Sequence, residues 1–458
     1  MGLARGWHVT APARRAQLSD AVTALLSRRA WWIGWLVALA LSAAIHVFGF
    51  PGVQDHPPYR IDFDVYRTGG QVVLDGGDIF AILPALAQGD YLPFTYPPIA
   101  ALIFTLFALI PLGVVSTLMT LASIAGLGYC LVLIARFTWN ISVRTALGLT
   151  LPLLALGLWI GPVRETLLFG QINILLMVGI LAGLLAGTAP WRPSGRADGD
   201  AHPARASLWG PLLVGLVSAV KLTPLVFGLY YLARRDFRGA AAMTAGFAVS
   251  TGIGFAVLPG ASVEYWTTTL LSSERIGAPS FATNQGFNGL LQRLVGDGPT
   301  ATAIWIALSI ASIAVIGILA WALSRAGRPA DAALAVALVS LFASPVTWGH
   351  HWVWIVPFAI VVLRIALPRM TSVAAAPLPA SLVLYARILA VAGALIFYAT
   401  PYWLVPHGDG AEQDWSVLDH IVGNAFVLWA LAFLVLLAWW ARVPHSADPS
   451  GKVWPEND

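Results

Sequence analysis

The chain has 458 residues, of which 58% are hydrophobic and only 10% are charged. Soluble domains carry roughly 25% charged residues, so this composition excludes an ordinary soluble protein and indicates a polytopic membrane protein. The formal net charge is +4, but membrane proteins use basic residues to set topology, so it does not indicate nucleic-acid binding. The single cysteine, Cys130, excludes an internal disulfide.

The N-terminal segment, residues 1–30, is basic and precedes a long apolar run at 31–50. That run has no small-residue cleavage site, so we interpret it as an uncleaved first span with a cytoplasmic N-terminus. A spanning helix needs about 20 mostly apolar residues. Further candidate runs follow at 98–115, 117–136, 145–161, 167–188, 208–232, 239–258, 301–324, 331–348, 351–367, 380–400 and 416–441.

These runs predict one all-α membrane domain, residues 31–441, with about twelve transmembrane helices and a cytoplasmic tail at 442–458. In the second half, the basic positions fit the cytoplasmic side. In the first half, strict alternation places the arginines of 136–144 and 192–205 outside, against the same rule. A second layout makes 97–115 re-entrant or interfacial and breaks 208–232 at "KLTP". The sequence leaves both layouts open.

Three segments are predicted to face outside: 51–97, 259–300 and the short acidic stretch 401–415. The first two are long extracytoplasmic loops, and loops of that length usually carry function. Residues 189–206 are interpreted as a solvated connector. No internal sequence repeat is visible, which disfavours an inverted-repeat transporter.

Asp62 and Asp64 lie soon after the first span, within "YRIDFDVYRTGG". A carboxylate there could serve as a general base, or the pair as D-x-D metal ligands, or either as a helix cap. In an extended segment the two carboxylates share a face, whereas in a helix they diverge. A single essential aspartate therefore remains as good an interpretation as a pair.

Lys221 is the most informative single residue, because it interrupts an apolar run with no acid nearby. Burying an unpaired ammonium costs several kcal/mol, and the following Thr-Pro can open the helix. An anionic ligand such as a phosphate would supply the partner, and a distant carboxylate is the alternative. Further polar groups at membrane depth interrupt "GPVRETLLFGQINILL": Arg164, Glu165, Gln171 and Asn173. Interhelical hydrogen bonding or an Arg164–Glu165 surface turn is the alternative.

The second outside segment contains "NQGFNGLLQRL", in which Asn284, Gln285, Asn288 and Arg293 flank an apolar stretch at helical spacing. We predict a short interfacial helix whose amides face a polar ligand, with ordinary loop polarity as the alternative. Amides suit hydroxyl-rich sugars through hydrogen bonds, and the rings of Tyr96 and Trp348 through stacking.

His350 and His351 lie at the start of a predicted helix that begins outside, in "SPVTWGHHWVW". Neighbouring histidines point to different sides of a helix, so at most one lines a given cavity. Metal chelation on a helix favours i,i+4 spacing, which the doublet lacks. An outside aspartate, an outside histidine and an intramembrane lysine fit group transfer from a lipid-phosphate donor.

Six stretches resemble glycosyltransferase family 87, in family order from residue 62 to 357. They are "DFDVYRTGGQVVLDGGDIF", "FTYPPIAALIF", "GQINILL", "KLTPLVFGLYYLARR", "NQGFNGLLQRL" and "SPVTWGHHWVWIVP". The resemblance implies a GT-C type membrane fold acting on the outer face of the plasma membrane. It implies a polyprenyl-phosphate-mannose donor and a glycolipid acceptor such as a phosphatidylinositol mannoside, with Asp62 as the catalytic aspartate.

On this resemblance we expect an inverting α-1,2-mannosyltransferase in which Lys221, Arg293 and Arg164 bind the donor phosphate. His350 or His351 would assist Asp62 or bind that phosphate. Asp64, Tyr96, Gln171, Asn284, Gln285, Asn288 and Trp348 would contact sugar or acceptor. The donor carries one phosphate, so no metal and no cofactor are expected. Transfer of arabinofuranose instead, or a lipid or polyprenol transporter, are the alternatives.

Overall fold

The computed structural model describes residues 19–49, 58–186, 207–272, 276–370 and 378–443. Within these ranges every regular element is a helix. Residues 1–18 of the predicted cytoplasmic segment, the predicted connector 189–206 and residues 444–458 of the predicted tail lie outside the described residues.

The first half of the chain forms a run of helices that differ widely in length. They are α1 (Asp20–Ser27), α2 (Arg29–Phe48), α3 (Ile61–Leu74), α4 (Pro98–Ala108), α5 (Leu112–Trp139), α6 (Val143–Gly157), α7 (Gly161–Phe169) and α8 (Asn173–Ala186). Next come α9 (Trp209–Val220), η1 (Thr223–Phe227), α10 (Gly228–Ala233) and α11 (Phe237–Val257).

The second half alternates long helices with short ones at the predicted outside segments. It contains α12 (Pro259–Thr267), η2 (Thr269–Leu271), α13 (Phe287–Val295), α14 (Pro299–Arg325), α15 (Pro329–Ala343), η4 (Gly349–Trp354) and α16 (Ile355–Ala366). The chain continues with η5 (Pro368–Met370), α17 (Ala380–Ala399), η6 (Pro401–Trp403), η7 (Ala411–Asp414), α18 (Val417–Gly423) and α19 (Ala425–Ala441).

Among the described residues, six helices are long and apolar enough to cross a membrane. The number rises to eight if two bent pairs, α6 with α7 and α18 with α19, each count as one span. Five further apolar helices are shorter than 18 residues. The chain is therefore an all-α multi-pass membrane protein, although these lengths alone do not give the predicted twelve spans.

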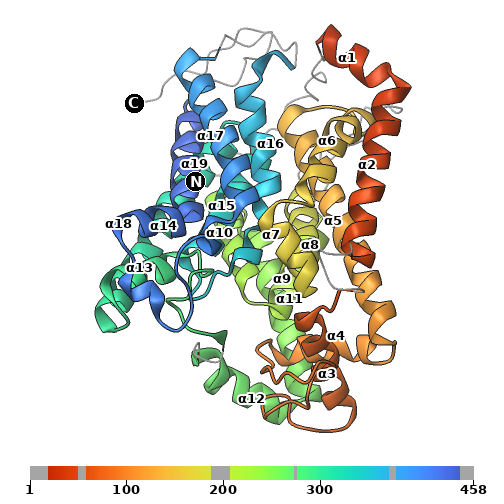
Figure 1. Ribbon diagram of the computed structural model, residues 1–458, viewed down its shortest axis with the longest axis vertical. Helices are drawn as coiled ribbons and strands as arrows, with labels where there is room; N and C mark the ends of the chain where they lie inside the picture. The colour runs from red at the N-terminus through yellow and green to blue at the C-terminus, as the bar shows by residue number, and fades with distance from the viewer. Residues whose placement is uncertain (1–18, 50–57, 187–206, 273–275, 371–377, 444–458) are drawn as a thin grey trace, which may run out of the picture.

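Two features of the second predicted layout are present. The helix at Pro98–Ala108 has only 11 residues and lies with α3 and α12 at one end of the bundle (Figure 1). The run 208–232 is broken, because α9 ends at Val220 and Lys221 has an extended backbone with φ −148° and ψ 132°. Pro224 lies in the first turn of η1 and lacks an N–H, so the preceding residues cannot continue α9 in register.

The long helices run roughly side by side in Figure 1, with α1 at one end and α3, α4 and α12 at the other. The first and second predicted outside segments therefore lie at the same end of the bundle. The third joins the second, since the backbone N–H of Ala282 donates to Glu412 Oε1 over 3.0 Å. Most buried side chains form one large core within the bundle. A smaller core around Phe63, Tyr66, Phe94 and Phe104 holds α3 against α4.

Candidate active site

Arg60, the residue before α3, fixes the start of that helix against three others. Its buried guanidinium donates to the carbonyl oxygens of His46 at the end of α2 and Leu167 in α7, and to Ser116 Oγ in α5. Asp62 and Asp64 then fall in the first turn of α3, where the helix dipole favours negative charge. The side chain of Asp62 is half-buried and faces the bundle.

Gly170 brings α7 close to this turn. It ends α7 with φ +74°, a left-handed conformation that glycine adopts without penalty. A Cβ at this position would lie 2.6 Å from Cβ of Phe63 and 2.9 Å from Cβ of Arg60. The absence of that atom lets the next residue, Gln171, reach Asp62.

Gln171 links Asp62 to two tyrosines. Its Nε2 donates to Asp62 Oδ2 over 2.6 Å, and its Oε1 accepts from the hydroxyls of Tyr66 at 2.9 Å and Tyr96 at 3.3 Å. Because hydroxyl donors occupy the amide oxygen, the amide nitrogen is the end that faces the carboxylate. Burial raises the pKa of the Asp62 carboxyl, while the Gln171 hydrogen bond and the positive charge of Lys221 lower it by less.

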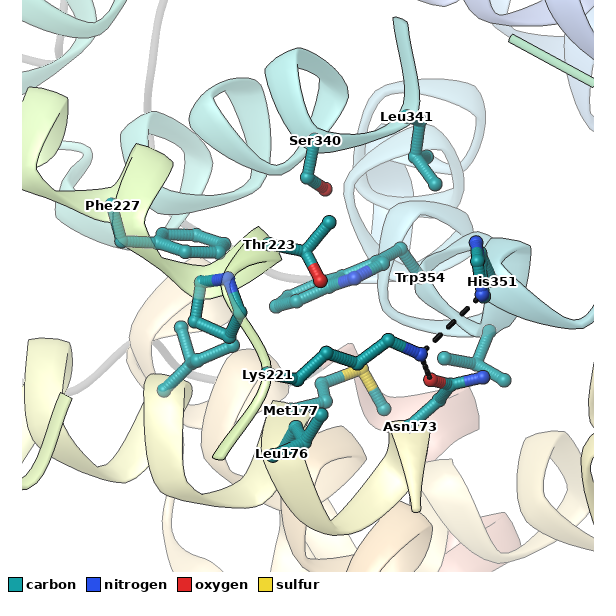
Figure 2. A pocket seen from close by; sticks show the side chains of 13 residues that line it. Asn173, Leu176, Met177, Lys221, Thr223, Phe227, Ser340, Leu341, His351 and Trp354 are labelled. Atoms are coloured by element: carbon teal, nitrogen blue, oxygen red, sulfur yellow. Dashed lines mark hydrogen bonds between the residues drawn. The ribbon is translucent and has the colours of Figure 1, made fainter. Parts of the chain in front are cut away.

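Lys221 lies on the other side of Tyr96. Its ammonium donates to Asn173 Oδ1 over 2.9 Å and lies 3.5 Å from the Tyr96 hydroxyl and 3.4 Å from His351 Nε2. Figure 2 shows the ammonium between Asn173 and His351. The three partners are an amide oxygen, a hydroxyl and an imidazole. Among the described residues, no carboxylate hydrogen-bonds to this ammonium.

An apolar cavity opens beside this ammonium. Apart from Lys221, its lining residues come from α8, η1, α15 and η4, and the labelled ones in Figure 2 include Leu176, Met177, Phe227 and Trp354. Its empty space, with the open side included, is about 440 Å³. Lys221 and His351 are the two basic side chains in the lining, so an anion with an apolar tail matches the chemistry of this wall.

The two histidines take different places. The ring of His351 lines the cavity and faces Lys221. His350 is buried with its ring edge-on to Phe169, and its carbonyl oxygen accepts from Thr166 Oγ1 and Asn173 Nδ2. The two rings touch edge to face, with centroids 4.8 Å apart, but only His351 of the predicted pair lines the cavity.

Asp64 differs from the expected sugar-binding role. Residues 61–74 are helical, so the side chains of positions 62 and 64 point to different faces. The buried Asp64 carboxylate accepts from the Tyr59 hydroxyl and the backbone N–H of Ala87, both at 2.8 Å. These bonds hold the loop after α3, and the two aspartates do not converge on a shared ligand.

Arg293 lies in a separate cluster, in contrast to its expected place at the donor phosphate. Its guanidinium donates to the carbonyl oxygens of Ser280, Phe281 and Asn284 and to Asn424 Oδ1. Burial lowers the pKa of Arg293 to about 9, and the Glu412 charge acts in the opposite direction. These bonds tie residues 280–284 and Asn424 to α13, so the cluster fastens the second outside segment to the turn between α18 and α19.

The predicted amides of the second outside segment join the same cluster. Asn288 donates to the carbonyl oxygen of Pro345, and Asn284 both donates to Pro279 and accepts from the Thr347 backbone. Gln285 donates to the carbonyl oxygens of Ala282 and Gly423. The predicted short helix is present as α13, but these amides serve backbone groups. Trp348 is half-buried with its ring near Phe281, and Arg164 is half-buried in α7.

Sequence reasoning missed Tyr66, and it noted Asn173 as a polar group at membrane depth without assigning it to the donor site. Tyr66 follows Asp62 by four residues, which places both on one face of α3, so helical spacing could have identified it. Asn173 donates to the His350 carbonyl and accepts from Lys221. Its role depends on α8 beginning beside the α9 break, which no local pattern indicates.

Comparison with known proteins adds family information to this geometry. Residues 94–345 match the model of glycosyltransferase family 87. A polyprenol-phosphate-mannose-dependent alpha-(1-2)-phosphatidylinositol mannoside mannosyltransferase of Mycobacterium tuberculosis is 35% identical over 430 residues, covering 90% of this chain and 91% of that protein. The protein of the same description from Mycolicibacterium smegmatis is 34% identical over 406 residues, covering 83% and 84%.

A second relative from Mycolicibacterium smegmatis is described as an alpha-(1-2)-phosphatidylinositol pentamannoside mannosyltransferase. It is 34% identical over 301 residues, covering 65% of this chain and 68% of that protein. Among solved structures, ArnT from Cupriavidus metallidurans bound to undecaprenyl phosphate matches with a TM-score of 0.39 and 16% identity, covering 91% of this chain and 78% of ArnT. A TM-score of that size does not establish a shared fold.

The family match spans more than half of the chain, and its ends enclose Tyr96, Gln171, Asn173 and Lys221. Asp62 lies 32 residues before that match, and His351 lies six residues after it. The six motifs and the comparisons agree, and the chain belongs to glycosyltransferase family 87.

Proposed function

We propose that this chain transfers mannose from polyprenyl-phosphate-mannose to a phosphatidylinositol mannoside, forming an α-1,2 linkage. The observation that carries the proposal is the hydrogen-bonded series from Asp62 through Gln171 and Tyr96 to Lys221. It links a carboxylate with a raised pKa, through two intervening side chains, to an ammonium at the wall of an apolar cavity. The names of the mycobacterial relatives support mannose as the sugar and the phosphatidylinositol mannoside as the acceptor.

The reaction is a single displacement with inversion at the anomeric carbon. Asp62 accepts the proton of an acceptor hydroxyl, and that oxygen forms a bond to C1 of the mannose as the bond from C1 to the phosphate oxygen breaks. The electron pair of the broken bond remains on the phosphate, and polyprenyl monophosphate leaves. Lys221 and His351 face the position where its charge grows, and interactions that strengthen with that charge accelerate the step.

The proposed topology has about twelve crossings in a GT-C type arrangement, within residues 31–441. In it the four shorter segments α8, α9, η1 with α10, and α15 cross together with the longer helices, and α4 does not. This layout returns the loop of Arg136 and Arg144 to the cytoplasmic side, as the positive-inside rule favours. Asp62, the second outside segment and the third outside segment then face the extracytoplasmic side of the plasma membrane.

Impermeant thiol labelling tests the proposed faces. In a Cys130→Ala background, cysteines placed at the exposed positions Gln88 and Gln413 are expected to react in intact cells. A cysteine at the exposed position Phe237 should react only after the membrane is permeabilised. If the cysteine at 237 is labelled in intact cells and the one at 88 is protected, the active site faces the cytoplasm and the proposed topology is wrong.

The function is tested with purified protein in detergent, a phosphatidylinositol mannoside acceptor and a panel of donors. We expect a new α-1,2-linked mannose from polyprenyl-phosphate-mannose and no product from polyprenyl-phosphate-arabinofuranose. Transfer of arabinofuranose but not of mannose would show that polyprenyl-phosphate-mannose is not the donor. Movement of lipid across vesicles without any new glycosidic bond would instead identify a transporter.

The rate should depend on pH through Asp62. Because only the deprotonated carboxylate can accept a proton, activity falls as pH drops through its pKa. Burial raises that pKa, so the acid limb of kcat/KM should lie above the value of about 3.9 for an ordinary aspartate. Enzyme incubated at each pH and assayed at pH 7.5 controls for denaturation. A reversible acid limb at or below pH 4 contradicts the assignment.

A further inference from the structure

Glu165 is a buried carboxylate that the proposed mechanism does not use. It lies in α7, and its Oε1 accepts from the Tyr402 hydroxyl at 2.7 Å and from Trp403 Nε1–H at 3.1 Å. Both donors belong to η6, at the start of the third outside segment. A carboxylate acceptor makes such bonds stronger than neutral ones. The pair therefore ties η6 firmly to α7.

The same carboxylate rests against the turn that carries the histidines. A Cβ at Gly349 would lie 2.6 Å from Glu165 Oε2 and would also overlap the Tyr402 hydroxyl. Glu165 and Tyr402 thus occupy the space that a side chain at position 349 would need. Their contact fixes the first residue of η4 from one side.

The next residue of the turn is hydrogen-bonded by side chains of α7 and α8. The His350 carbonyl oxygen accepts from Thr166 Oγ1 over 3.0 Å and from Asn173 Nδ2 over 3.2 Å. Thr166 directly follows Glu165 in α7, so one helix supplies both the carboxylate and the hydroxyl. α7 therefore packs closely against Gly349 through Glu165 and hydrogen-bonds the His350 carbonyl through Thr166.

This turn sets the geometry around Lys221. Asn173 donates to the His350 carbonyl through Nδ2 and accepts from Lys221 through Oδ1, so the position of that carbonyl fixes which end of the amide faces the lysine. His351, one residue later, lies 3.4 Å from the same ammonium. A shift of the turn would therefore move two of the three neutral groups around Lys221 together.

We propose that Glu165, with Tyr402 and Trp403, is a positioning residue for the donor phosphate site. It holds the Gly349–His351 turn so that His351, Asn173 and Lys221 converge on the leaving phosphate. This inference rests on the proposed function, because it assigns Lys221 to the donor. It also gives the third outside segment a role, which is to lock the donor site rather than to contact the sugar.

The test measures donor binding and turnover for three variants and a matched control. Glu165→Ala should weaken binding of polyprenyl-phosphate-mannose and lower kcat, each by about 10- to 100-fold, because small misplacements of reacting groups cost that much. The acceptor KM should stay near the wild-type value. Glu165→Gln should retain part of the donor binding and part of kcat, since its amide oxygen can still accept the hydrogen bonds from Tyr402 and Trp403. Tyr402→Phe should fall between wild type and Glu165→Ala.

Tyr398→Phe is the control. It removes one hydroxyl, as Tyr402→Phe does, but Tyr398 is exposed on the preceding helix. Donor binding and kcat should both stay at the wild-type values. In a Lys221→Met background, Glu165→Ala should lower donor affinity by a smaller factor than it does in the wild type, because only His351 and Asn173 remain to be misplaced. A purely structural role for Glu165 would add its full loss in that background and would change the acceptor KM as well.

The outcomes separate the two proposals. If Lys221→Met binds donor weakly while folded Glu165→Gln and Tyr402→Phe both bind it like wild type, the positioning role is wrong and the proposed function stands. If Lys221→Met itself binds donor like wild type, the donor site is wrong and the positioning role falls with it. Glu165→Gln and Tyr402→Phe decide the matter even if Glu165→Ala does not fold.

Discussion

Asp62→Asn is expected to lower turnover by about 10²- to 10⁴-fold, the usual contribution of a general base. The amide cannot accept the proton of the acceptor hydroxyl, yet it retains an oxygen for the bond from Gln171 Nε2. The start of α3 should stay in place, because Arg60 holds it through bonds to three other helices. Binding of polyprenyl-phosphate-mannose should therefore be close to wild type, as measured by thermal stabilisation in detergent.

Asp64 in α3 and Asp75 at the C-cap of that helix serve as comparisons for Asp62→Asn. Asp75→Asn makes the same change at the exposed end of the helix, so its turnover should match wild type. Asp64→Asn should reduce thermal stability more than turnover per folded molecule, because Asp64 accepts from Tyr59 and Ala87. Near-normal turnover in Asp62→Asn, together with an inactive but folded Asp64→Asn, would show that Asp64 and not Asp62 is the general base.

Lys221→Met has the second large expected effect. A hydrogen bond to a charged group contributes about 1.5–3 kcal/mol, so we expect donor affinity to fall by about 10- to 100-fold. The rate of transfer should fall further, by about 10²-fold or more, since the charge on the leaving phosphate grows in the transition state. Lys221→Arg should recover part of the donor affinity and part of the transfer rate, because it restores the charge with a different geometry.

The alternative for Lys221 is that its charge serves only Asp62. The lysine lowers the pKa of that carboxyl, so its removal should move the acid limb of the kcat/KM profile to higher pH under either interpretation. Donor affinity separates the two. Wild-type affinity in folded Lys221→Met, combined with the shifted acid limb, would remove Lys221 from the phosphate site and leave His351 as the remaining basic group in the cavity wall.

The sequence by itself determined the class of protein and much of the family assignment. Composition and long apolar runs determine a membrane protein, because hydrocarbon can be crossed only by segments that satisfy their own backbone. The order of six motifs indicated family 87, and the comparisons confirm it. Lys221 was also visible, since a charged group in an apolar segment is costly and stands out without any knowledge of its neighbours. Asp62 was singled out by its place soon after the first span and by the family resemblance.

Local patterns also predicted the short helix α13 and left open the break at Lys221. Proline chemistry acts within a few residues of the chain, which is why "KLTP" could indicate the end of α9. The same pattern could not decide between the two layouts. That decision depends on how the short helices pack against the long ones, and packing partners are distant in sequence.

Only the tertiary structure decided which polar residues meet. Arg293 and Asn284 looked like ligand-binding groups, but they fasten the outside segments through buried backbone carbonyls. Gln171 lies 109 residues from Asp62 in the chain, and Glu165 lies 237 residues from Tyr402. A polar side chain has the same sequence signature whether it satisfies a buried backbone group or faces a substrate. The difference lies in which helices pack together, because that sets the partner each buried donor and acceptor must find.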